Sequence, residues 1–327
     1  MSAAQLAWGI LGAGKIAHQY ADGLNASDRN TLVAVGSRQI STADAFAAKH
    51  QIPRTHGSYD ALLADPAVQA IYISLPNSMH HEWTIKALRA GKHVLCEKPM
   101  ATNLAQLQEM FDEAKRAGRV LAEAFMYRSH PLTHAVHKAV KEGRVGKVRV
   151  IRTSFIYSAE KIAGNVRFSS SLAGGSLMDI GCYCLSYSRL MAGSEPESMQ
   201  GHGHIHESGV DDYAAAVLKF PGDIVATFAC GMTVHADNTA CVMGDKGYIE
   251  VPLPWKPPSS DAVYTLVDST GSRHTTMVSS HKHLYTPEAD DFAASVIDGA
   301  PLRVSQAESL GNQHCLDVLR RQIGVAF

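Results

Sequence analysis

The segment Trp8-Gly-Ile-Leu-Gly-Ala-Gly-Lys-Ile-Ala17 decides how the first part of this 327-residue chain folds. It overlaps a short apolar run, Leu6–Leu11, and leads into an amphipathic stretch. Gly12 permits a tight turn, Gly14 lets a pyrophosphate approach the backbone, and Ala17 lets the following helix pack near the strand. The N–H groups at the start of that helix favour phosphate. The segment therefore predicts a dinucleotide-binding turn, the alternative being a purely structural glycine-rich turn.

Short apolar runs alternate with helical stretches of about ten residues throughout the first 124 residues. We expect strands at 6–11, 31–36, 70–75, 93–96 and 120–124, and helices at 15–24, 41–50, 80–90 and 104–117. This alternation is typical of a parallel sheet that is covered by helices on both faces. It predicts an α/β protein that begins with a doubly wound Rossmann domain.

The rhythm changes after about residue 146. Strands are expected at 147–157, 213–220, 224–234, 240–243 and 248–251, and helices at 175–191, 288–297 and 305–323. Successive strands without intervening helices predict a second, α+β domain with a large open, mainly antiparallel sheet. Pro252–Pro258 is expected to form a stiff surface loop. We place the domain boundary between residues 124 and 125.

Composition excludes several classes of protein. The formal net charge is −1, so bulk electrostatics gives no reason to expect nucleic acid or acidic lipid as a partner. No window approaches the ~18 apolar residues that a membrane span needs. Six cysteines are scattered without a C-x-x-C pair, which favours reduced thiols. We therefore expect a globular, cytoplasmic protein without membrane or nucleic-acid partners.

The end of the second predicted strand indicates the cofactor. NAD-specific sites place Asp or Glu there to accept from the ribose 2′-hydroxyl, whereas an arginine accommodates a 2′-phosphate. Here the strand ends in Ser37 and Arg38, with no acidic residue before Asp44. A guanidinium makes paired, charge-assisted bonds to phosphate. The sequence therefore predicts NADP(H) as the preferred cofactor and NAD(H) as the second option; the alternative is a solvated Arg38.

Two short stretches carry groups suited to proton transfer. Glu97-Lys98-Pro99 follows the strand at 93–96, at the sheet edge where doubly wound folds bind ligands. Asp179 and Tyr183 are four residues apart, so both project from one face of the predicted helix. The alternatives are a surface lysine and a carboxylate–phenol hydrogen bond without a catalytic role. From these residues alone, catalysis stays open.

Four longer stretches resemble the Gfo/Idh/MocA oxidoreductase family, in order and over nearly the full chain: 9–17, 74–100, 123–131 and 165–185. Most members have D-x-G-x-H where this chain has Asp179 to Tyr183. The tyrosine version is similar to the branch of glucose–fructose oxidoreductase, NADP-dependent D-xylose dehydrogenase and dimeric dihydrodiol dehydrogenase. Ala173 departs from the glycine that relatives often have, which should only tighten the turn.

The resemblance implies roles for individual residues. Lys98 matches the catalytic lysine, in a Lys98–Pro99 peptide that is often cis; Tyr183 matches the proton donor or acceptor, and Asp179 the assisting acid. Asn77 and His80 match positions near the nicotinamide. The expected substrate-binding residues are Lys98, Arg128, Arg167, Asp179 and Tyr183. The expected cofactor-binding residues are Gly12, Gly14, Lys15, Ile16, Ser37, Arg38, Leu75, Pro76, Asn77, His80, Glu97 and Lys98.

The same resemblance implies the domain roles. Residues 1–124 would bind the dinucleotide, and residues 125–327 would bind substrate and form a homo-oligomer through the open sheet. We thus expect an NADP(H)-dependent enzyme that transfers hydride to or from a sugar, cyclitol or sugar ketone, a small polyhydroxy substrate. One alternative is a trans-dihydrodiol dehydrogenase. Another is a non-catalytic NADP(H)-binding sensor, against which the presence of Lys98, Asp179 and Tyr183 argues.

Tyrosine and lysine suit this reaction because the cofactor carries the hydride and the protein must handle a proton. A free tyrosine ionises near pH ~10. An ammonium ~4 Å away favours the phenolate by roughly 4 kcal/mol at an effective dielectric of ~20, and burial opposes part of that gain. Lys98 could also donate directly to the substrate oxygen. How the proton role divides between Lys98 and Tyr183 stays open.

Three alternating histidines, His202, His204 and His206, suggest imidazoles on one face of a strand. Such a row resembles a metal-ligand arrangement. Only Glu207 adds a carboxylate, and glycines lie within and around the segment, so the row alone does not define a site. We favour a polar sheet face or a dimer surface and predict no metal.

Overall fold

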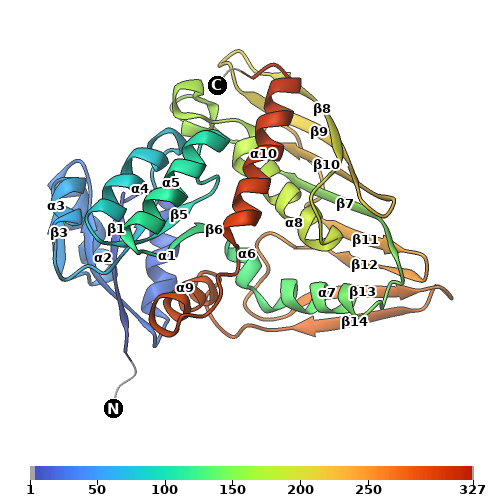
Figure 1. Ribbon diagram of the computed structural model, residues 1–327, viewed down its shortest axis with the longest axis horizontal. Helices are drawn as coiled ribbons and strands as arrows, with labels where there is room; N and C mark the ends of the chain where they lie inside the picture. Colours follow the sequence, from blue (N-terminus) through green and yellow to red (C-terminus); the bar gives the residue numbers. More distant parts are fainter. Residues whose placement is uncertain (1–3, 326–327) are drawn as a thin grey trace. The chain divides into compact units, whose positions relative to one another are not determined.

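The computed structural model describes residues 4–325, which divide into two compact units (Figure 1). Of the described residues, the first unit contains those up to Ser129 and Lys282–Ser309, and the second contains His130–His281 and those from Leu310 onward. Residues 282–309 thus belong to the first unit, whereas the predicted boundary assigns them to the second. The reason is helix α9 (Thr286–Asp298), whose Phe292 ring packs 5.1 Å from that of Trp8.

The first unit contains a six-stranded parallel sheet of order β3-β2-β1-β4-β5-β6. Its strands are β1 (Leu6–Leu11), β2 (Asn30–Gly36), β3 (Arg54–His56), β4 (Ala70–Ile73), β5 (His93–Glu97) and β6 (Leu121–Ala124). The central strands are buried on both faces, which explains their continuous apolar runs. This arrangement confirms the predicted doubly wound Rossmann sheet. Of these six strands, only the three-residue β3 was not predicted from the sequence.

Helices cover this sheet. They are α1 (Lys15–Asn25), α2 (Ile40–His50), α3 (Tyr59–Leu63), α4 (His80–Arg89) and α5 (Leu104–Ala117), together with α9, the short α6 (Met126–Ser129) and the 3₁₀ turn η1 (Asn77–Met79). Each long helix buries an apolar stripe, as Tyr20 and Leu24 of α1 show. The chain therefore delivers the loops after β1, β2, β4 and β5 to one edge of the sheet.

The second unit contains an eight-stranded sheet of order β14-β13-β12-β11-β7-β10-β9-β8, in which only β7 and β10 are parallel. The strands are β7 (Val148–Ile156), β8 (Ser198–Ile205), β9 (Asp211–Phe220), β10 (Ile224–Gly231), β11 (Ala240–Gly244), β12 (Gly247–Val251), β13 (Ala262–Asp268) and β14 (Arg273–Val278). The prediction of a large, mainly antiparallel sheet is confirmed.

Helices pack against one face of this sheet (Figure 1). They are α7 (Pro131–Lys141), α8 (Cys182–Ala192) and α10 (Gln306–Gln322), accompanied by the 3₁₀ turns η2 (Val166–Phe168) and η3 (Ser170–Leu172) and the π-helical turn η4 (Leu177–Gly181). Along β9, buried Ala216 and Leu218 alternate with exposed Tyr213 and Val217. The strand thus has one covered and one open face.

Among the differences from the sequence-based expectations, two concern segments of the second unit. The segment at 252–258 is more than a surface loop, because its Trp255 is only 2% exposed and stacks on Phe155. The predicted helix at 175–191 is two elements, η4 and α8, because a π turn interrupts the α-helical spacing. Among residues 4–325, no helix has the length and apolarity required to cross a membrane.

Candidate active site

The turn between β1 and α1 has the shape that a pyrophosphate requires. Gly12 has φ +102°, and a Cβ there would lie 3.0 Å from both Ser74 Oγ and a Leu75 methyl group. Gly14 caps α1 without any side-chain hydrogen bond, and a Cβ there would meet nothing within 4 Å. The start of α1 thus has no side-chain cap and lies beside an open backbone at Gly14, an arrangement that fits a dinucleotide phosphate. Lys15 and Ile16 form the first turn of α1.

The residues after β2 form the second part of this edge. Ser37 is buried, and its N–H donates to the carbonyl of His56 at 3.1 Å. Arg38 is exposed and interacts with the phenol of Tyr59 on α3. Burial raises the pKa of Tyr59, and the charge of Arg38 and its hydrogen bond oppose that rise. Sequence reasoning missed Tyr59, because no local spacing connects it to Arg38.

The segments after β4 and β5 are held together by His80. This imidazole is fully buried, with Nδ1 2.9 Å from the carbonyl of Pro99 and Nε2 2.8 Å from that of Leu75. Burial lowers the pKa of His80 although both carbonyls oppose the shift. Pro76 and Asn77 lie in the connection between Leu75 and His80. The contact fixes the position of the loop that is expected to face the nicotinamide.

Lys98 follows β5 directly. The Lys98–Pro99 peptide is cis, as the resemblance implies. Glu97 accepts from the phenol of Tyr72 and from the backbone N–H of Lys98, the latter at 3.2 Å. The carboxyl ends of β1, β2, β4 and β5 thus bring all the predicted cofactor-binding residues to one edge of the sheet.

In the second unit, the predicted residues lie on a tightly constrained turn. Gly174 and Gly175 precede η4, and a Cβ on either would lie 2.2 Å from an oxygen atom. Asp179 lies within η4, where its Oδ2 accepts from Arg167 Nε at 2.8 Å and from the phenol of Tyr157 at 2.7 Å. Tyr157 is a further site residue that sequence reasoning missed, since it comes from the end of β7. One carboxylate oxygen is therefore fixed by two donors.

Tyr183 lies in the first turn of α8 and is 5% exposed. The Phe155 and Trp255 rings pack edge-on against it, at centroid distances of 5.3 and 6.1 Å. Trp255 in turn donates from Nε1 to the carbonyl of Ser154 at 2.7 Å. Tyr183 thus lies against an aromatic wall that strand β7 and the β12–β13 loop build.

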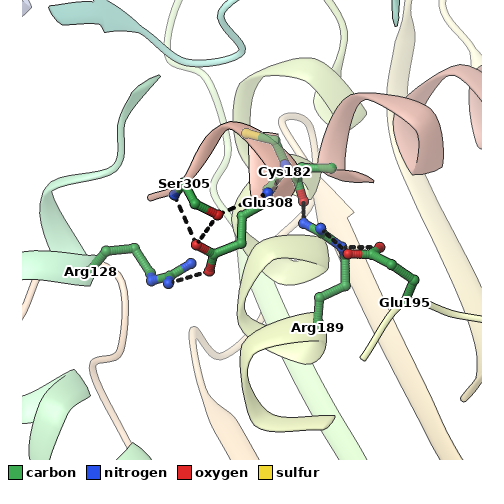
Figure 2. Close-up of polar contacts among 7 residues, drawn as sticks. Arg128, Cys182, Arg189, Glu195, Ser305 and Glu308 are labelled. Carbon is green, nitrogen blue, oxygen red and sulfur yellow. Dashed lines mark hydrogen bonds and ion pairs between the residues drawn. The ribbon is translucent and has the colours of Figure 1, made fainter. Parts of the chain in front are cut away.

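The backbone beside Tyr183 is anchored from α10. Asn312 Nδ2 donates to the carbonyl of Cys182 at 3.2 Å, and its Oδ1 accepts from Arg189 at 3.4 Å. Arg189 also pairs with Glu195, with Nε 2.7 Å from Oε2, as Figure 2 shows. These bonds hold α8 on both sides of the tyrosine.

Arg128, expected to line the substrate pocket, has a structural ion pair in the first unit. It is buried and donates to Glu308 Oε1 at 2.6 Å (Figure 2). It also donates to the carbonyl of Arg303 at 3.1 Å. Glu308 also accepts from the backbone N–H and hydroxyl of Ser305. The ion pair orients Arg128, whose contact with a substrate remains a prediction.

The histidine row is divided in the structure. His202 and His204 lie on β8, whereas His206 follows its end. His204 Nδ1 is 2.7 Å from Asp212, and its ring stacks on Tyr213 at 5.2 Å. Within the described residues, no three His, Cys, Asp or Glu side chains are arranged to hold a metal ion.

The fold and the sheet edge define a dinucleotide-binding protein of the Rossmann class, and comparisons with known proteins agree. Residues 6–125 match the family described as "Oxidoreductase family, NAD-binding Rossmann fold", and residues 133–250 match the GFO/IDH/MocA C-terminal domain. The chain belongs to the Gfo/Idh/MocA family of oxidoreductases, which confirms the resemblance and the predictions that it is an enzyme and binds a nicotinamide dinucleotide.

The relatives include several trans-1,2-dihydrobenzene-1,2-diol dehydrogenases. That of Mus musculus is 36% identical over 77% of this chain and 76% of its own length. That of Danio rerio is 31% identical over 98% of both chains. Among solved structures, KijD10, a 3-ketoreductase from Actinomadura kijaniata in complex with NADP and TDP-benzene, has a TM-score of 0.90 and 28% identity over 98% of both chains.

Proposed function

We propose that this chain is an NADP(H)-dependent oxidoreductase that transfers hydride between the nicotinamide and a CH–OH or C=O group of a sugar, cyclitol or sugar ketone. Each compact unit carries, on a constrained segment, one side chain whose chemistry suits proton transfer, and this placement supports the proposal. Lys98 follows β5 beside Glu97, and Tyr183 lies on α8 beside the π turn that holds Asp179. The first unit would bind the cofactor and the second the substrate.

The protein's part in the reaction is to bind, orient and move a proton. The cofactor, when bound, supplies or accepts the hydride. Tyr183 then donates a proton to the substrate oxygen during reduction or takes it during oxidation, and the Lys98 ammonium favours the anionic form of that oxygen. The Asp179 carboxylate, which Tyr157 and Arg167 hold in place, orients the Tyr183 phenol. Arg128 and Arg167 supply charged hydrogen-bond donors for polyhydroxy substrates.

The preference for NADP(H) rests on Ser37 and Arg38, a hydroxyl and a guanidinium at the end of β2 where an acidic residue would favour NAD(H). The similar ketoreductase was solved with NADP, which supports the same assignment. We expect binding of NAD(H) to be weaker, because its ribose offers Arg38 no charged partner.

We further propose that the chain forms a homo-oligomer through the open face of the second sheet. Tyr213, Val217 and Val225 are large apolar side chains exposed on neighbouring strands of that face. Large apolar side chains that are exposed together on one sheet face favour an interface. All six cysteines are buried thiols, which suits a reducing compartment and supports a cytoplasmic location.

A trans-dihydrodiol dehydrogenase is the second candidate, and the aromatic wall favours it. The half-buried Phe155 presents its ring beside Tyr183, with the buried Trp255 stacked behind it. A ring such as that of Phe155 stacks on unsaturated six-membered rings as well as on sugars. The curated relatives of Mus musculus and Danio rerio carry that activity in their names.

A substrate screen tests the proposed function. Aldoses, cyclitols and trans-dihydrodiols are each incubated with NADP⁺, and the absorbance of the reduced nicotinamide is followed. We expect turnover with at least one class, and a loss of roughly 100-fold or more in kcat in both Lys98→Met and Tyr183→Phe, with NADP(H) affinity almost unchanged. Lys86→Met and Tyr264→Phe are matched controls.

Each outcome has a distinct meaning. Wild-type rates in both Lys98→Met and Tyr183→Phe would remove the proposed mechanism. Tight NADP(H) binding without turnover of any substrate class would favour the sensor. Turnover of dihydrodiols alone would favour the second candidate.

A further inference from the structure

Asp211, the first residue of β9, lies against the start of the segment that carries Asp179 and Tyr183. Its side chain is fully buried. Oδ2 accepts hydrogen bonds from the hydroxyl of Ser176 at 2.6 Å and from the backbone N–H of Leu177 at 2.7 Å. The other oxygen, Oδ1, is buried without a hydrogen-bond partner. Burying a carboxylate with one unpaired oxygen destabilises the fold, which indicates that Asp211 has a specific role at this position.

The glycine turn before η4 is shaped around this carboxylate. Gly175 has φ +113°, and a Cβ there would lie 2.2 Å from Asp211 Oδ1. The N–H of Gly175 donates to the carbonyl of Arg167, and its own carbonyl accepts from the N–H of Asp179, both at 2.9 Å. Asp211 is therefore connected through one turn of backbone to Asp179.

The groups that face Asp211 come from three further elements. Ser176 precedes η4, Cys230 lies on β10 with Sγ 3.5 Å from Ser176 Oγ, and Arg320 lies on α10. Burial raises the pKa of Asp211 to about 6, while the bonds from Ser176 and Leu177 and the charge of Arg320 oppose the rise. Asp211 in turn helps to raise the pKa of the Cys230 thiol, which burial already raises well above its usual range.

We propose that Asp211 is a positioning residue, whose ionised carboxylate fixes the first turn of segment 176–183 and thereby the orientation of Asp179 and Tyr183. The inference rests on the proposed role of Tyr183. An ionised carboxylate forms stronger bonds to N–H and O–H donors than a protonated one does, and it complements the partial positive charge at a helix start. Protonation of Asp211 therefore loosens the turn that aims both side chains.

This role links turnover to pH. As the pH falls through the range in which Asp211 takes up a proton, near 6, kcat falls while cofactor affinity does not. The cofactor-binding residues lie in the other compact unit, which Asp211 does not belong to. A positioning role thus predicts that kcat decreases at acidic pH, and that this decrease, the acid limb of the pH profile, depends on residue 211.

Two variants separate positioning from a general loss of structure. Asp211→Asn keeps the shape and an oxygen that accepts from Leu177, but it cannot ionise; we expect kcat at pH 8 to fall roughly tenfold to a hundredfold and the acid limb near pH 6 to disappear. Ser176→Ala removes one bond that favours the ionised form, so the acid limb should move to higher pH. Asp212→Asn is the matched control, because its carboxylate bonds His204 and Thr233 instead of the turn.

Amide hydrogen exchange provides a readout that needs no substrate. In Asp211→Asn, we expect faster exchange at Leu177 and the amides up to residue 180, with unchanged exchange in the central strand β7. Wild-type kcat, acid limb and exchange in Asp211→Asn would overturn the proposal, as would a Ser176→Ala limb that stays or moves to lower pH. If no substrate is turned over, the proposed function fails. If exchange at Leu177 is equally slow in wild type and Asp211→Asn, the positioning role of Asp211 fails.

Discussion

The phenol oxygen of Tyr157 lies 2.7 Å from Oδ2 of Asp179, at the oxygen that also accepts from Arg167. Burial and the nearby charge of Asp179 raise the pKa of Tyr157 above its usual range. The phenol therefore remains a proton donor at neutral pH. Three segments, namely the residue that follows β7, the turn η2 and the π turn η4, meet at one carboxylate oxygen. This contact gives Asp179 a fixed orientation that a helical i, i+4 spacing alone does not provide.

Replacing Tyr157 by phenylalanine should slow turnover without unfolding the protein. The lost hydrogen bond is worth about 1 kcal/mol, and the Arg167 bond stays. We expect kcat to fall about fivefold, with KM for the cofactor unchanged, in steady-state assays. Tyr264→Phe, on β13, is the matched control. An unchanged kcat in Tyr157→Phe would show that Asp179 keeps its orientation without this donor.

The first sheet could be predicted because its information is local. The glycine turn, the apolar runs and the helices between them each lie within a few residues of sequence, and the parallel topology follows from their alternation. The same alternation also placed the loops that carry the predicted cofactor-binding residues. Residues 282–309 could not be assigned in this way, because the packing of Phe292 on Trp8 joins positions far apart in the chain.

The second unit was harder to predict. Strand β14 exposes most of its residues, and β8 contains two glycines, so neither shows a clear alternation of apolar and polar residues. The resemblance placed Asp179 and Tyr183 in the candidate site. The residues that support them are non-local: Tyr157 directly follows β7, Asp211 begins β9 and Asn312 lies on α10. Such contacts follow from the tertiary fold and leave no spacing in the sequence.

Arg38 should determine the choice of cofactor. A charge-assisted hydrogen bond to a phosphate is worth about 1.5–3 kcal/mol, which corresponds to roughly 10- to 150-fold in affinity. In Arg38→Ala, we therefore expect the Kd of NADP(H) to rise by about that factor and the Kd of NAD(H) to change less than about threefold, as measured by fluorescence titration of the reduced cofactors. Arg144→Ala, an exposed arginine in the second unit, is the control. Equal losses for both cofactors would defeat the assignment.

Glu288 should make the stability of the protein depend on pH. It is 6% exposed on α9, its Oε2 has no hydrogen-bond partner, and it lines a cavity of about 20 Å³. Burial, then the charges of Glu97 and Asp291, raise its pKa well above the usual range. The folded chain thus keeps a proton on Glu288 that the unfolded chain releases above pH ~4.3. The contribution of Glu288 to the free energy of unfolding therefore falls as the pH rises toward the pKa of Glu288 in the folded protein.

Glu288→Gln removes this dependence. The amide keeps the shape of the protonated acid, so wild type and variant should be similar near pH 4.5. Above that, the free energy of unfolding of the variant should gain on the wild type by up to about 1.4 kcal/mol per pH unit. Urea unfolding between pH 5 and 8 measures the difference, with exposed Glu207→Gln as the control. A constant difference across this range would mean that Glu288 is ionised in the folded protein.

Gly12 and Gly14 should respond to alanine in opposite ways. At Gly12, φ is +102° and the added Cβ would lie 3.0 Å from two side-chain atoms, so Gly12→Ala should lower the free energy of unfolding by more than about 1 kcal/mol. At Gly14, the backbone has φ −80° and the Cβ would meet no protein atom within 4 Å. Gly14→Ala should therefore leave stability unchanged or slightly raised.

Cofactor binding, in contrast to stability, should be sensitive to a side chain at Gly14. If a pyrophosphate approaches the backbone at Gly14, the methyl group that the protein accommodates would occupy the space of the phosphate. We expect Gly14→Ala to weaken NADP(H) at least about tenfold, a cost of about 1.4 kcal/mol, while its urea midpoint stays at that of the wild type. Calorimetric titration and unfolding of the same sample measure both quantities. If a stable Gly14→Ala protein bound NADP(H) with wild-type affinity, the phosphates would have to lie elsewhere. The reason is that a pyrophosphate in close contact with the backbone at residue 14 leaves no room for a methyl group there.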